Sequence, residues 1–403
     1  MNYDFLHKLR TVRVKDILSL FLFFLALPVS KIYKLKRKHI WLICEYGQEA
    51  RDNAFYLFKY LCKKHPEVDA VYALSKSSVD YKKVSEIGEV INYGGLKHWI
   101  FYLAAEANIS SQKGGKPNAA ICYLLEVLTG VLKNTRIFLQ HGIILNDLPF
   151  LHYDKTKLSL FVCSVRKEFF CIRDNYGYPK GSVVLTGMCR YDALMNKSDG
   201  GRICIIPTWR EWLYHTHDME KIEGTKNFLQ TVYYKMWSSV LLEILKQYDD
   251  TDLQIDLYLH RNMQQYNCYF SKLGDRLNVI SATDGDVAEV LKRSACLITD
   301  YSSVANDFAY MNKPLAYFQP DHEQFHKFHL SEGYFSYKND GFGEVCYTQE
   351  KLLEWLDKTV SCGFVQDEKY ANRIENFFEF RDANNCERNY LAIKSLLAEK
   401  VKN

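Results

Sequence analysis

Short apolar runs alternate with longer amphipathic segments along most of this chain, and that alternation limits the folds it can adopt. The first unit shows the pattern: residues 40–44 read Ile-Trp-Leu-Ile-Cys, and the helix predicted over 52–63 places Phe55, Phe58 and Leu61 on one face. Strand–helix units of this kind favour a parallel sheet covered by helices. We therefore predict an α/β protein.

Two series of such units follow one another, separated by the polar, glycine-containing stretch 196–202. The first series has further strands predicted at 68–74, 90–93, 107–110, 136–140, 158–163 and 182–186, with helices at 96–105 and 119–132. The second has strands at 203–206, 255–259, 277–280, 295–299 and 315–318, with helices near 227–248, 286–293 and 302–312. A chain of 403 residues exceeds one ordinary domain, so we predict two Rossmann-like lobes, at 39–197 and, with the C-terminal helices, at 198–403.

Positive charge is concentrated at the start of the chain. Residues 1–38 contain nine Lys and Arg against two Asp, a charge of +7, so the remaining residues carry −3 of the overall +4. The basic character therefore belongs to one end and not to a surface spread over both lobes. This distribution argues against a nucleic-acid groove, and we expect no nucleic-acid partner.

An apolar run of thirteen residues, Ile17–Val29, lies within this basic segment and contains one polar residue. It is shorter than the ~20 residues that cross a bilayer. Basic side chains beside such a run are attracted to anionic lipid, which favours a helix lying in the membrane interface. We interpret 1–38 as a membrane-associating segment, while a spanning or signal segment and a plain core helix remain alternatives.

The twelve cysteines form no CxxC pair and no cluster with metal-ligand spacing, and most lie in apolar runs. They indicate reduced core cysteines and a globular part that faces a reducing cytoplasm. His322 and His326 are four residues apart, with His329 nearby, but no recognisable zinc motif accompanies them. We expect no metal and no cofactor.

Candidate site residues follow four of the predicted strands. They are His141 and Gly142 after the first of these strands, Thr208 and Arg210 after the second, His260 and Arg261 after the third, and Asp300, Ser302 and Ser303 after the fourth. Ligands of open parallel sheets bind beyond the carboxyl ends of the strands. These residues therefore predict a reaction site, which we place in a cleft between the lobes.

The chemistry of these residue types suggests roles for them in each of the two predicted lobes. Histidine has a pKa suited to a base near neutral pH, so His141 could act as a base or could be structural, and Gly142 beside it would let a ligand approach the backbone. Ser302 and Ser303 begin a predicted helix and could cradle a phosphate, although Ser302 or Asp300 could serve only as a helix cap. Arg210, His260 and Arg261 could neutralise a pyrophosphate or form salt bridges. Asp307, one turn into the helix, could be solvated or structural.

Several segments in this order and spacing resemble the CDP-glycerol glycerophosphotransferase family of teichoic-acid and capsule biosynthesis. They are residues 138–146, 187–192, 206–210, 257–260 and 297–304, with Asp307 and Lys313-Pro314, and residues 41–45, 50–53 and 58–61 nearer the N-terminus. The resemblance covers most of residues 40–395. It implies two Rossmann lobes of the GT-B type, metal-independent transfer, and peripheral attachment to the cytoplasmic face of the cell membrane.

The same resemblance implies roles for individual residues. His141 would deprotonate the acceptor hydroxyl, with Gly142 and Asn146 on the acceptor side. His260, Arg210, Ser302 and Ser303 would hold the pyrophosphate of CDP-glycerol, His260 as a second catalytic residue, with Thr208 and Arg261 nearby. Asp300 and Asp307 would orient that loop or contact the donor. Attack at the phosphorus next to the glycerol would release CMP and form a phosphodiester.

Other functions stay open at this stage. A CDP-ribitol donor differs little from CDP-glycerol, and a hexosyltransferase with a UDP or GDP donor shares the architecture. A membrane-docked, non-enzymatic assembly scaffold is the third alternative. The acceptor, a lipid-linked polymer or saccharide leading to teichoic acid or capsular polysaccharide, and the oligomeric state are not specified by the sequence.

Overall fold

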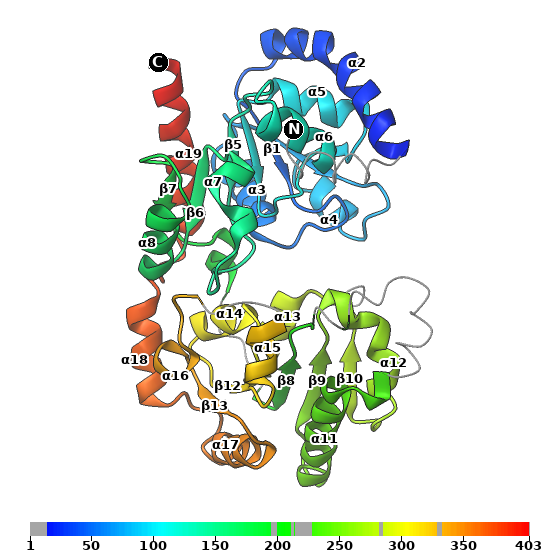
Figure 1. Ribbon diagram of the computed structural model, residues 1–403, viewed down its shortest axis with the longest axis vertical. Coiled ribbons are helices and arrows are strands. Elements are labelled where there is room, and N and C mark those ends of the chain that lie inside the picture. The colour runs from blue at the N-terminus through cyan, green and yellow to red at the C-terminus, as the bar shows by residue number, and fades with distance from the viewer. Residues whose placement is uncertain are drawn as a thin grey trace. The chain divides into compact units, whose positions relative to one another are not determined.

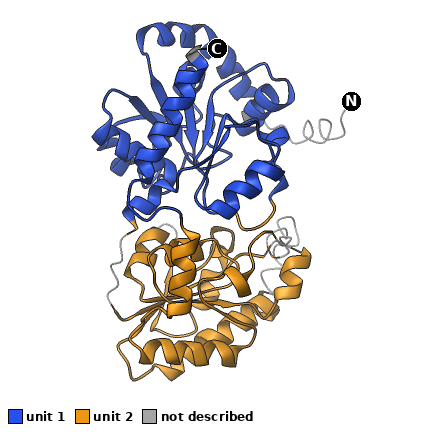
Figure 2. Cartoon of the chain, turned by 90° about the vertical axis from the view of Figure 1, so that its left-hand side faces the viewer, with its two compact units in different colours: residues 1–143, 148–193, 379–403 blue, residues 144–147, 194–378 orange. Residues whose placement is uncertain are grey.

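The computed structural model describes residues 14–194, 200–210, 213, 228–281, 285–328 and 333–402 (Figure 1). It confirms the α/β class, with two parallel sheets and an N-terminal apolar helix. The chain divides into two compact units (Figure 2). Unit 1 comprises residues 1–143, 148–193 and 379–403, and unit 2 comprises 144–147 and 194–378. The predicted linker at 196–202 lies largely outside the described residues.

Unit 1 contains a seven-stranded parallel sheet in the order β3-β2-β1-β4-β5-β6-β7. Its strands are β1 Ile40–Cys44, β2 Asp69–Leu74, β3 Glu89–Asn92, β4 Ala107–Ser110, β5 Arg136–Phe138, β6 Leu160–Cys163 and β7 Val183–Leu185. Its helices are α2 Val14–Lys36, α3 Asn53–Lys64, α4 Tyr81–Ser85, α5 Leu96–Ala104, α6 Ala119–Tyr123, α7 Tyr153–Thr156, α8 Arg166–Asn175 and α19 Asn385–Lys402. The strand order reverses between β1 and β4, so the loops after these two strands share one edge of the sheet.

Unit 2 contains a six-stranded parallel sheet in the order β10-β9-β8-β11-β12-β13. Its strands are β8 Arg202–Ile206, β9 Gln254–Tyr258, β10 Leu277–Ile280, β11 Cys296–Thr299, β12 Leu315–Phe318 and β13 Glu344–Cys346. Its helices are α11 Val232–Gln247, α12 Asn267–Phe270, α13 Val287–Arg293, α14 Val304–Tyr310, α15 His322–Phe328, α16 Tyr337–Asp340, α17 Gln349–Ser361 and α18 Glu368–Phe377. Here the order reverses between β8 and β11, which brings the loops after those strands together.

The last helix, α19, belongs to unit 1, which corrects the prediction that residues up to 403 form part of the second lobe. Its apolar side chains Tyr390 and Ile393 pack in the same buried cluster as Trp41 of β1. At the start of α19 the Asp192 carboxylate accepts hydrogen bonds from the backbone N–H groups of Asn385 and Cys386, at 2.9 and 2.8 Å. Apolar burial and this cap together attach the end of the chain to the first sheet.

Helix α2 is also part of unit 1, where it lies along α5 (Figure 1). Phe23 and Ala26 are buried in the same cluster as Trp99 of α5. The Trp99 indole N–H donates a hydrogen bond of 3.0 Å to the Ser19 hydroxyl, which is buried as well. The helix has 23 residues, ten more than the thirteen-residue run in the sequence. The described part of the predicted 1–38 segment is therefore built into the fold on one of its faces.

A buried histidine in α5 predicts acid sensitivity of the fold. His98 is completely buried, and its Nδ1 accepts a hydrogen bond of 3.0 Å from the backbone N–H of Gly94. Burial lowers the pKa of this imidazole from 6.5 to about 3. Below pH 6.5 the unfolded chain binds a proton that the folded chain excludes, so stability falls as the pH drops from 6.5 toward 3. We expect His98 to cost about 2 kcal/mol of unfolding free energy at pH 5 relative to pH 8.

The substitution His98→Gln keeps an acceptor for Gly94 but removes the titrating group. Urea unfolding of both proteins at pH 5 and pH 8 measures the difference. The variant should lose about 2 kcal/mol less than the parent between these two pH values. If both proteins lose the same free energy, His98 is protonated without difficulty in the folded state, and the assignment is wrong.

Candidate functional site

His141 lies just beyond β5, where an unusual backbone turn fixes it. The preceding residue, Gln140, has a left-handed φ of 64° and is almost fully buried. Its carbonyl oxygen accepts a hydrogen bond of 2.8 Å from the side chain of Asn53, and its own side-chain amide donates to the backbone carbonyl of Val162. The turn is therefore held by α3 on one side and β6 on the other, and it presents His141 at the carboxyl edge of the sheet.

A buried carboxylate orients the His141 ring. The Nδ1 atom of His141 lies 2.6 Å from Oδ2 of Asp52, the residue that caps α3. The side chain of His141 is 70% exposed, whereas that of Asp52 is 11% exposed. Gln112, which follows β4, also contacts this pair. Its side-chain nitrogen lies 2.7 Å from Nδ1 of His141 and donates a hydrogen bond of 3.2 Å to Oδ2 of Asp52. An accessible imidazole backed by a buried acid is the arrangement of a general base.

Arg190 completes this network from the loop after β7. Its Nη1 donates to Asp52 Oδ1 at 2.9 Å and to the carbonyl oxygen of His141 at 2.8 Å. Its backbone N–H donates to the Asn53 side chain at 3.0 Å. Arg190 is 8% exposed, so its charge balances the Asp52 carboxylate inside the protein. It holds the acid and the backbone of the base in a fixed relation.

Glu45, directly after β1, supports the same corner. Its carboxylate accepts hydrogen bonds from the backbone N–H groups of Arg51, Asp52 and Phe55, all between 2.9 and 3.0 Å. Burial, reinforced by the neighbouring Asp52 carboxylate, raises the pKa of Glu45 to about 8, and these three bonds oppose the rise. The result is a rigid start to α3, which fixes the position of Asp52.

The sequence alone did not identify Asp52, Gln112 and Arg190 as members of this site. In the sequence Asp52 is only the first residue of the helix predicted over 52–63, and Arg190 lies only within a segment that resembles the family. The available signal was position: Asp52 and Gln112 follow β1 and β4, the two strands at which the sheet order reverses. That reversal becomes visible only when the strand order is known.

In unit 2, Arg210 forms the centre of a buried ionic cluster. Its guanidinium is completely buried and lies 2.9 Å from an Asp300 oxygen and 2.8 Å from an Asp321 oxygen. It also donates to the Thr208 carbonyl oxygen at 2.8 Å. Burial alone would lower the pKa of Arg210, but the attraction of Asp300 and Asp321 outweighs it and raises the pKa above its ordinary value. The arginine therefore stays charged and paired.

This geometry corrects the predicted role of Arg210 as a direct contact to a pyrophosphate. The guanidinium joins three loops, after β8, β11 and β12, and acts as a positioning group. Asp300 completes the connection, since its Oδ1 accepts hydrogen bonds from the backbone N–H groups of Thr208 and Tyr301, at 2.8 and 2.6 Å. The Thr208 hydroxyl is buried and makes no hydrogen bond within the described part of the chain.

His260 lies after β9 at the start of the 3-10 helix Arg261–Tyr266. Its Nδ1 accepts a hydrogen bond of 3.2 Å from the backbone N–H of Asn262, so in the neutral ring the proton is on Nε2. The ring stacks on Trp209, with centroids 5.8 Å apart and planes inclined by 19°. His260 therefore presents an N–H donor, in contrast to His141, whose Nδ1 faces a carboxylate.

Ser302 and Ser303 follow β11 and are partly exposed. Ser303 occupies the cap position of α14 without a capping hydrogen bond from its hydroxyl, and the Ser302 hydroxyl accepts a long bond of 3.4 Å from Val304. Asp307 is 7% exposed within α14, and Arg261 is exposed at the surface. The two serine hydroxyls are thus the more accessible groups of this loop.

The structure divides the predicted site residues between the units. His141 and Gly142 belong to unit 1, whereas Asn146, predicted in the first lobe, belongs to unit 2 because residues 144–147 pack there. A Cβ atom on Gly333 would lie only 2.2 Å from the Leu145 carbonyl oxygen and 2.6 Å from Cα of Asn146. Glycine at 333 therefore allows this short segment to lie directly against unit 2.

The two histidines four residues apart in the sequence, His322 and His326, both lie in α15. The rings of His322 and His326 have centroids 4.6 Å apart. Within the described residues, no group of three or more His, Cys, Asp or Glu side chains is placed to hold a metal ion. His329 lies outside the described residues.

The two parallel α/β sheets, each with polar groups gathered where its strand order reverses, are the two Rossmann-like units that a fold of the GT-B type contains. The family model of CDP-glycerol:poly(glycerophosphate) glycerophosphotransferases matches residues 25–395, and the chain belongs to this family.

Curated relatives of this chain include teichoic acid proteins of Bacillus. The chain is 31% identical over 380 residues to the minor teichoic acid biosynthesis protein GgaB of Bacillus subtilis, a match covering 91% of this chain and 41% of GgaB. It is 24% identical over 267 residues to the teichoic acid poly(glycerol phosphate) polymerase of Bacillus spizizenii, covering 65% of this chain and 53% of the polymerase. The chain thus spans about half the length, or less, of these relatives.

A solved structure of the wall teichoic acid polymerase TagF has the same fold. It superposes with a TM-score of 0.63 at 16% sequence identity, covering 96% of this chain and 99% of the TagF chain. At this sequence identity the similarity establishes the fold only, and the chemistry must be argued from the residues of the site.

Proposed function

We propose that this chain transfers glycerol phosphate from CDP-glycerol to a hydroxyl of a teichoic-acid or capsular acceptor and releases CMP. The observation that carries the proposal is the exposed His141 imidazole with its Nδ1 2.6 Å from buried Asp52. Membership of the glycerophosphotransferase family supports CDP-glycerol as the donor substrate. The relatives named for poly(glycerol phosphate) synthesis support the polymer.

The first unit supplies the base. With Nδ1–H directed at Asp52, the neutral imidazole accepts a proton at Nε2. The acceptor hydroxyl gives its proton to that nitrogen while its oxygen attacks the phosphorus that carries the glycerol. The P–O bond to CMP breaks, and a phosphodiester forms. Asp52 then stabilises the positive imidazolium, as a carboxylate partner does in serine hydrolases.

The second unit supplies donors for the pyrophosphate. His260 presents Nε2–H because its Nδ1 is occupied by the Asn262 N–H, and Ser302 and Ser303 present hydroxyls. Hydrogen bonds from such groups stabilise the charge that moves onto CMP as it leaves. Arg210 and Asp300 fix the loops that carry these donors, and Arg261 lies close along the chain.

We propose further that the transfer needs no metal ion. In this scheme His260, with the two serine hydroxyls, does the work that Mg²⁺ performs in many phosphoryl transfers. Addition of EDTA to the purified protein should leave the rate unchanged. A loss of transfer that Mg²⁺ restores would refute metal independence.

The experiment that tests the function is CMP release from CDP-glycerol, CDP-ribitol and UDP-glucose, each with a membrane extract as acceptor. We expect CMP from CDP-glycerol, only when the extract is present, and none from the other two nucleotides. Release from CDP-ribitol would assign the polyol differently, and release of UDP would favour a hexosyltransferase. No release from any donor would leave the scaffold alternative.

We also propose that the protein docks peripherally on the cytoplasmic face of the membrane through the outer face of α2. Residues Asp16–Lys36 are long and apolar enough to cross a membrane, but Phe23 and Ala26 are buried against unit 1. The opposite face of the helix carries exposed apolar side chains. They are Ile17, Leu18, Phe21, Phe24, Leu25, Ile32 and Leu35. An apolar outer face followed by Lys31, Lys34 and Lys36 fits a helix lying in an anionic interface.

Replacing Phe21 and Phe24 together by serine should weaken binding to anionic vesicles by about 10²- to 10⁴-fold, because each buried phenylalanine contributes roughly 1.5–3 kcal/mol. Vesicle flotation measures the bound fraction. The control is Leu391→Ser, at a position 51% exposed on α19. Substitution is preferable to removal of residues 1–38, which would uncover Trp99. Equal flotation of the double variant and the parent would place the anchor elsewhere.

A further inference from the structure

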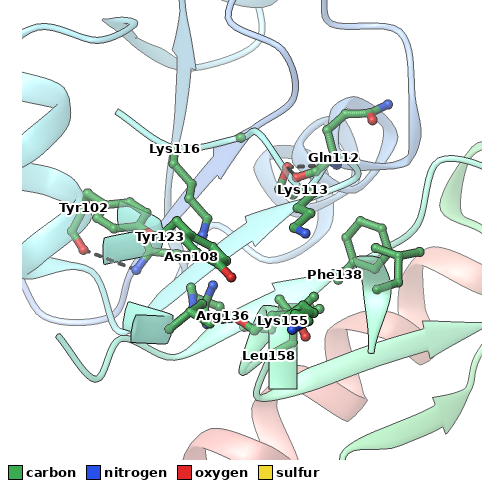
Figure 3. A pocket seen from close by; sticks show the side chains of 16 residues that line it. Tyr102, Asn108, Gln112, Lys113, Lys116, Tyr123, Arg136, Phe138, Lys155 and Leu158 are labelled. Carbon is green, nitrogen blue, oxygen red and sulfur yellow. Dashed lines mark hydrogen bonds between the residues drawn. The ribbon is translucent and has the colours of Figure 1, made fainter. Parts of the chain in front are cut away.

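A cavity opens in unit 1 along β4 and β5, from Asn108 and Arg136 to the loop after β4 (Figure 3). Its volume, including the part open to solvent, is about 500 Å³. Four basic side chains line it: Lys113, Lys116, Arg136 and Lys155. In this view Lys113 and Lys116 lie on one side of the opening and Arg136 and Lys155 on the other. No acidic side chain is among the residues that line the cavity in the described part of the chain.

Two of these cations are held in place by a buried acid behind the cavity. Glu126, 5% exposed, lies 2.7 Å from Lys116 and 2.8 Å from Arg136. The pair of cations exceeds the charge of this one carboxylate, so the cavity keeps a positive potential. Lys155, whose neighbour Asp154 lies 3.2 Å away at the surface, and Lys113, which donates to the Phe150 carbonyl oxygen at 2.7 Å, add further positive charge to the lining. Such a cavity favours an anion.

A neutral group in the cavity points to a second feature of the ligand. Asn108 of β4 is 7% exposed, and its side-chain nitrogen donates to the Tyr102 carbonyl oxygen at 3.2 Å. Its Oδ1 is buried and accepts no hydrogen bond within the described part of the chain. A buried carbonyl oxygen without a donor costs about 1–3 kcal/mol. A hydroxyl of a bound ligand would satisfy it.

The cavity lies next to the base. Gln112 lines the cavity, and the side-chain nitrogen of Gln112 is 2.7 Å from Nδ1 of His141. A ligand here would combine an anionic group with a hydroxyl and would lie near the group that removes a proton from the acceptor. A polyol phosphate ester has this combination. CDP-glycerol has it too, but the groups assigned to the donor are all in unit 2.

We propose that this cavity is the acceptor subsite, which binds a phosphate ester and an adjacent hydroxyl of the acceptor. The proposal rests on the function given above. In this subsite Lys113 and Lys155 contact the phosphate. Lys116 and Arg136, which are paired with Glu126, contribute positive electrostatic potential. The Asn108 side-chain oxygen accepts a hydrogen bond from the hydroxyl. The phosphate could belong to a growing poly(glycerol phosphate) chain or to the diphosphate that links a sugar to lipid.

Direct binding separates this subsite from the transfer reaction. The full chain is titrated, without donor, with tris(glycerol phosphate), with a sugar diphosphate carrying a short alkyl chain, and with triglycerol, which lacks phosphate. We expect one or both phosphate compounds to bind and triglycerol not to. Lys113→Ala combined with Lys155→Ala should weaken the binding by tenfold or more, since a charged hydrogen bond contributes about 1.5–3 kcal/mol.

Lys180→Ala, at an exposed lysine of the same unit, is the matched control and should bind within twofold of the parent. Asn108→Leu tests the hydroxyl contact without a change of charge and should also weaken binding. CDP-glycerol binding should be unchanged in the double lysine variant. The stronger of the two phosphate compounds identifies the source of the phosphate.

The proposal is overturned if neither phosphate compound binds the parent, or if the double lysine variant binds as tightly as the parent. Its failure is distinguishable from failure of the function. Transfer that proceeds with an unchanged acceptor KM in the double variant removes the subsite but keeps the transferase. Phosphate binding that depends on the lysines, with no CMP release from any donor, keeps an anion site and removes the transferase.

Discussion

Replacing His141 by alanine should lower the rate of transfer by about 10²- to 10⁴-fold, the usual contribution of a general base. Binding of CDP-glycerol should stay within a few fold, because the groups assigned to the donor lie in unit 2. The loss should appear in kcat and not in the KM for the donor. CMP release at saturating donor, with equilibrium binding of the donor alongside, measures both quantities.

The control for this prediction is His39→Ala, an exposed histidine of the same unit whose ring faces Glu106 at 3.1 Å. It should transfer at the parental rate. Wild-type turnover in His141→Ala would exclude His141 from the chemistry and leave the exposed ring without an assigned role.

Asp52→Asn tests whether the buried acid acts through the base. The amide cannot stabilise an imidazolium, so kcat should fall, and the fall should be much smaller once His141 is already alanine. Circular dichroism checks that α3 still forms, since Asp52 also caps it. Additive losses in the double variant would show that Asp52 affects transfer by another route.

The positions of the strands were predictable because their burial leaves a plain signal. All seven strands of unit 1 and the first five of unit 2 fall at the predicted apolar runs. The exception is β13, Glu344–Cys346, a three-residue edge strand. Its three residues, Glu-Val-Cys, include an exposed glutamate and form no continuous apolar run, so the sequence does not separate this strand from a loop.

The residues of the site were predictable only in part, because the order of strands in a sheet cannot be inferred from local sequence. Strand ends indicated His141, His260 and Asp300 correctly as groups at the sheet edges. That Asp52 meets His141, 89 positions later, depends on β1 lying beside β4 and β4 beside β5. Likewise α19 has an apolar face that either sheet could bury, and only the cap from Asp192 and the packing on Trp41 decide between them.

Arg210 shows a different limit, because an arginine after a strand has the same local sequence whether it contacts a ligand or a carboxylate. What decides is the pair of acids that converge on it from two other loops, Asp300 and Asp321. Because both carboxylates pair with the guanidinium, it is inaccessible to a ligand. Arg210 therefore has a structural role and does not contact the substrate. The same feature makes this position sensitive to substitution.

Arg210→Leu should destabilise the protein by about 3–5 kcal/mol, because two buried carboxylates lose their counter-charge. Arg261→Ala, at an exposed arginine, is the control and should change stability by less than about 0.5 kcal/mol. Urea unfolding measures both. A change below about 1 kcal/mol in Arg210→Leu would mean that Asp300 and Asp321 are neutral in the native protein and that the cluster is not ionic.

The pH dependence of the Arg210→Leu defect distinguishes loss of charge from loss of packing. Burial raises the pKa of Asp300, and Arg210 opposes that rise, so removing the arginine should raise the pKa further. A group whose pKa is raised on folding favours the folded state below its unfolded pKa and loses this contribution as the pH rises through the folded value. The defect should therefore be smaller at pH 5 than at pH 8. A packing defect would be equal at both, so a constant difference between variant and parent would reject the ionic explanation.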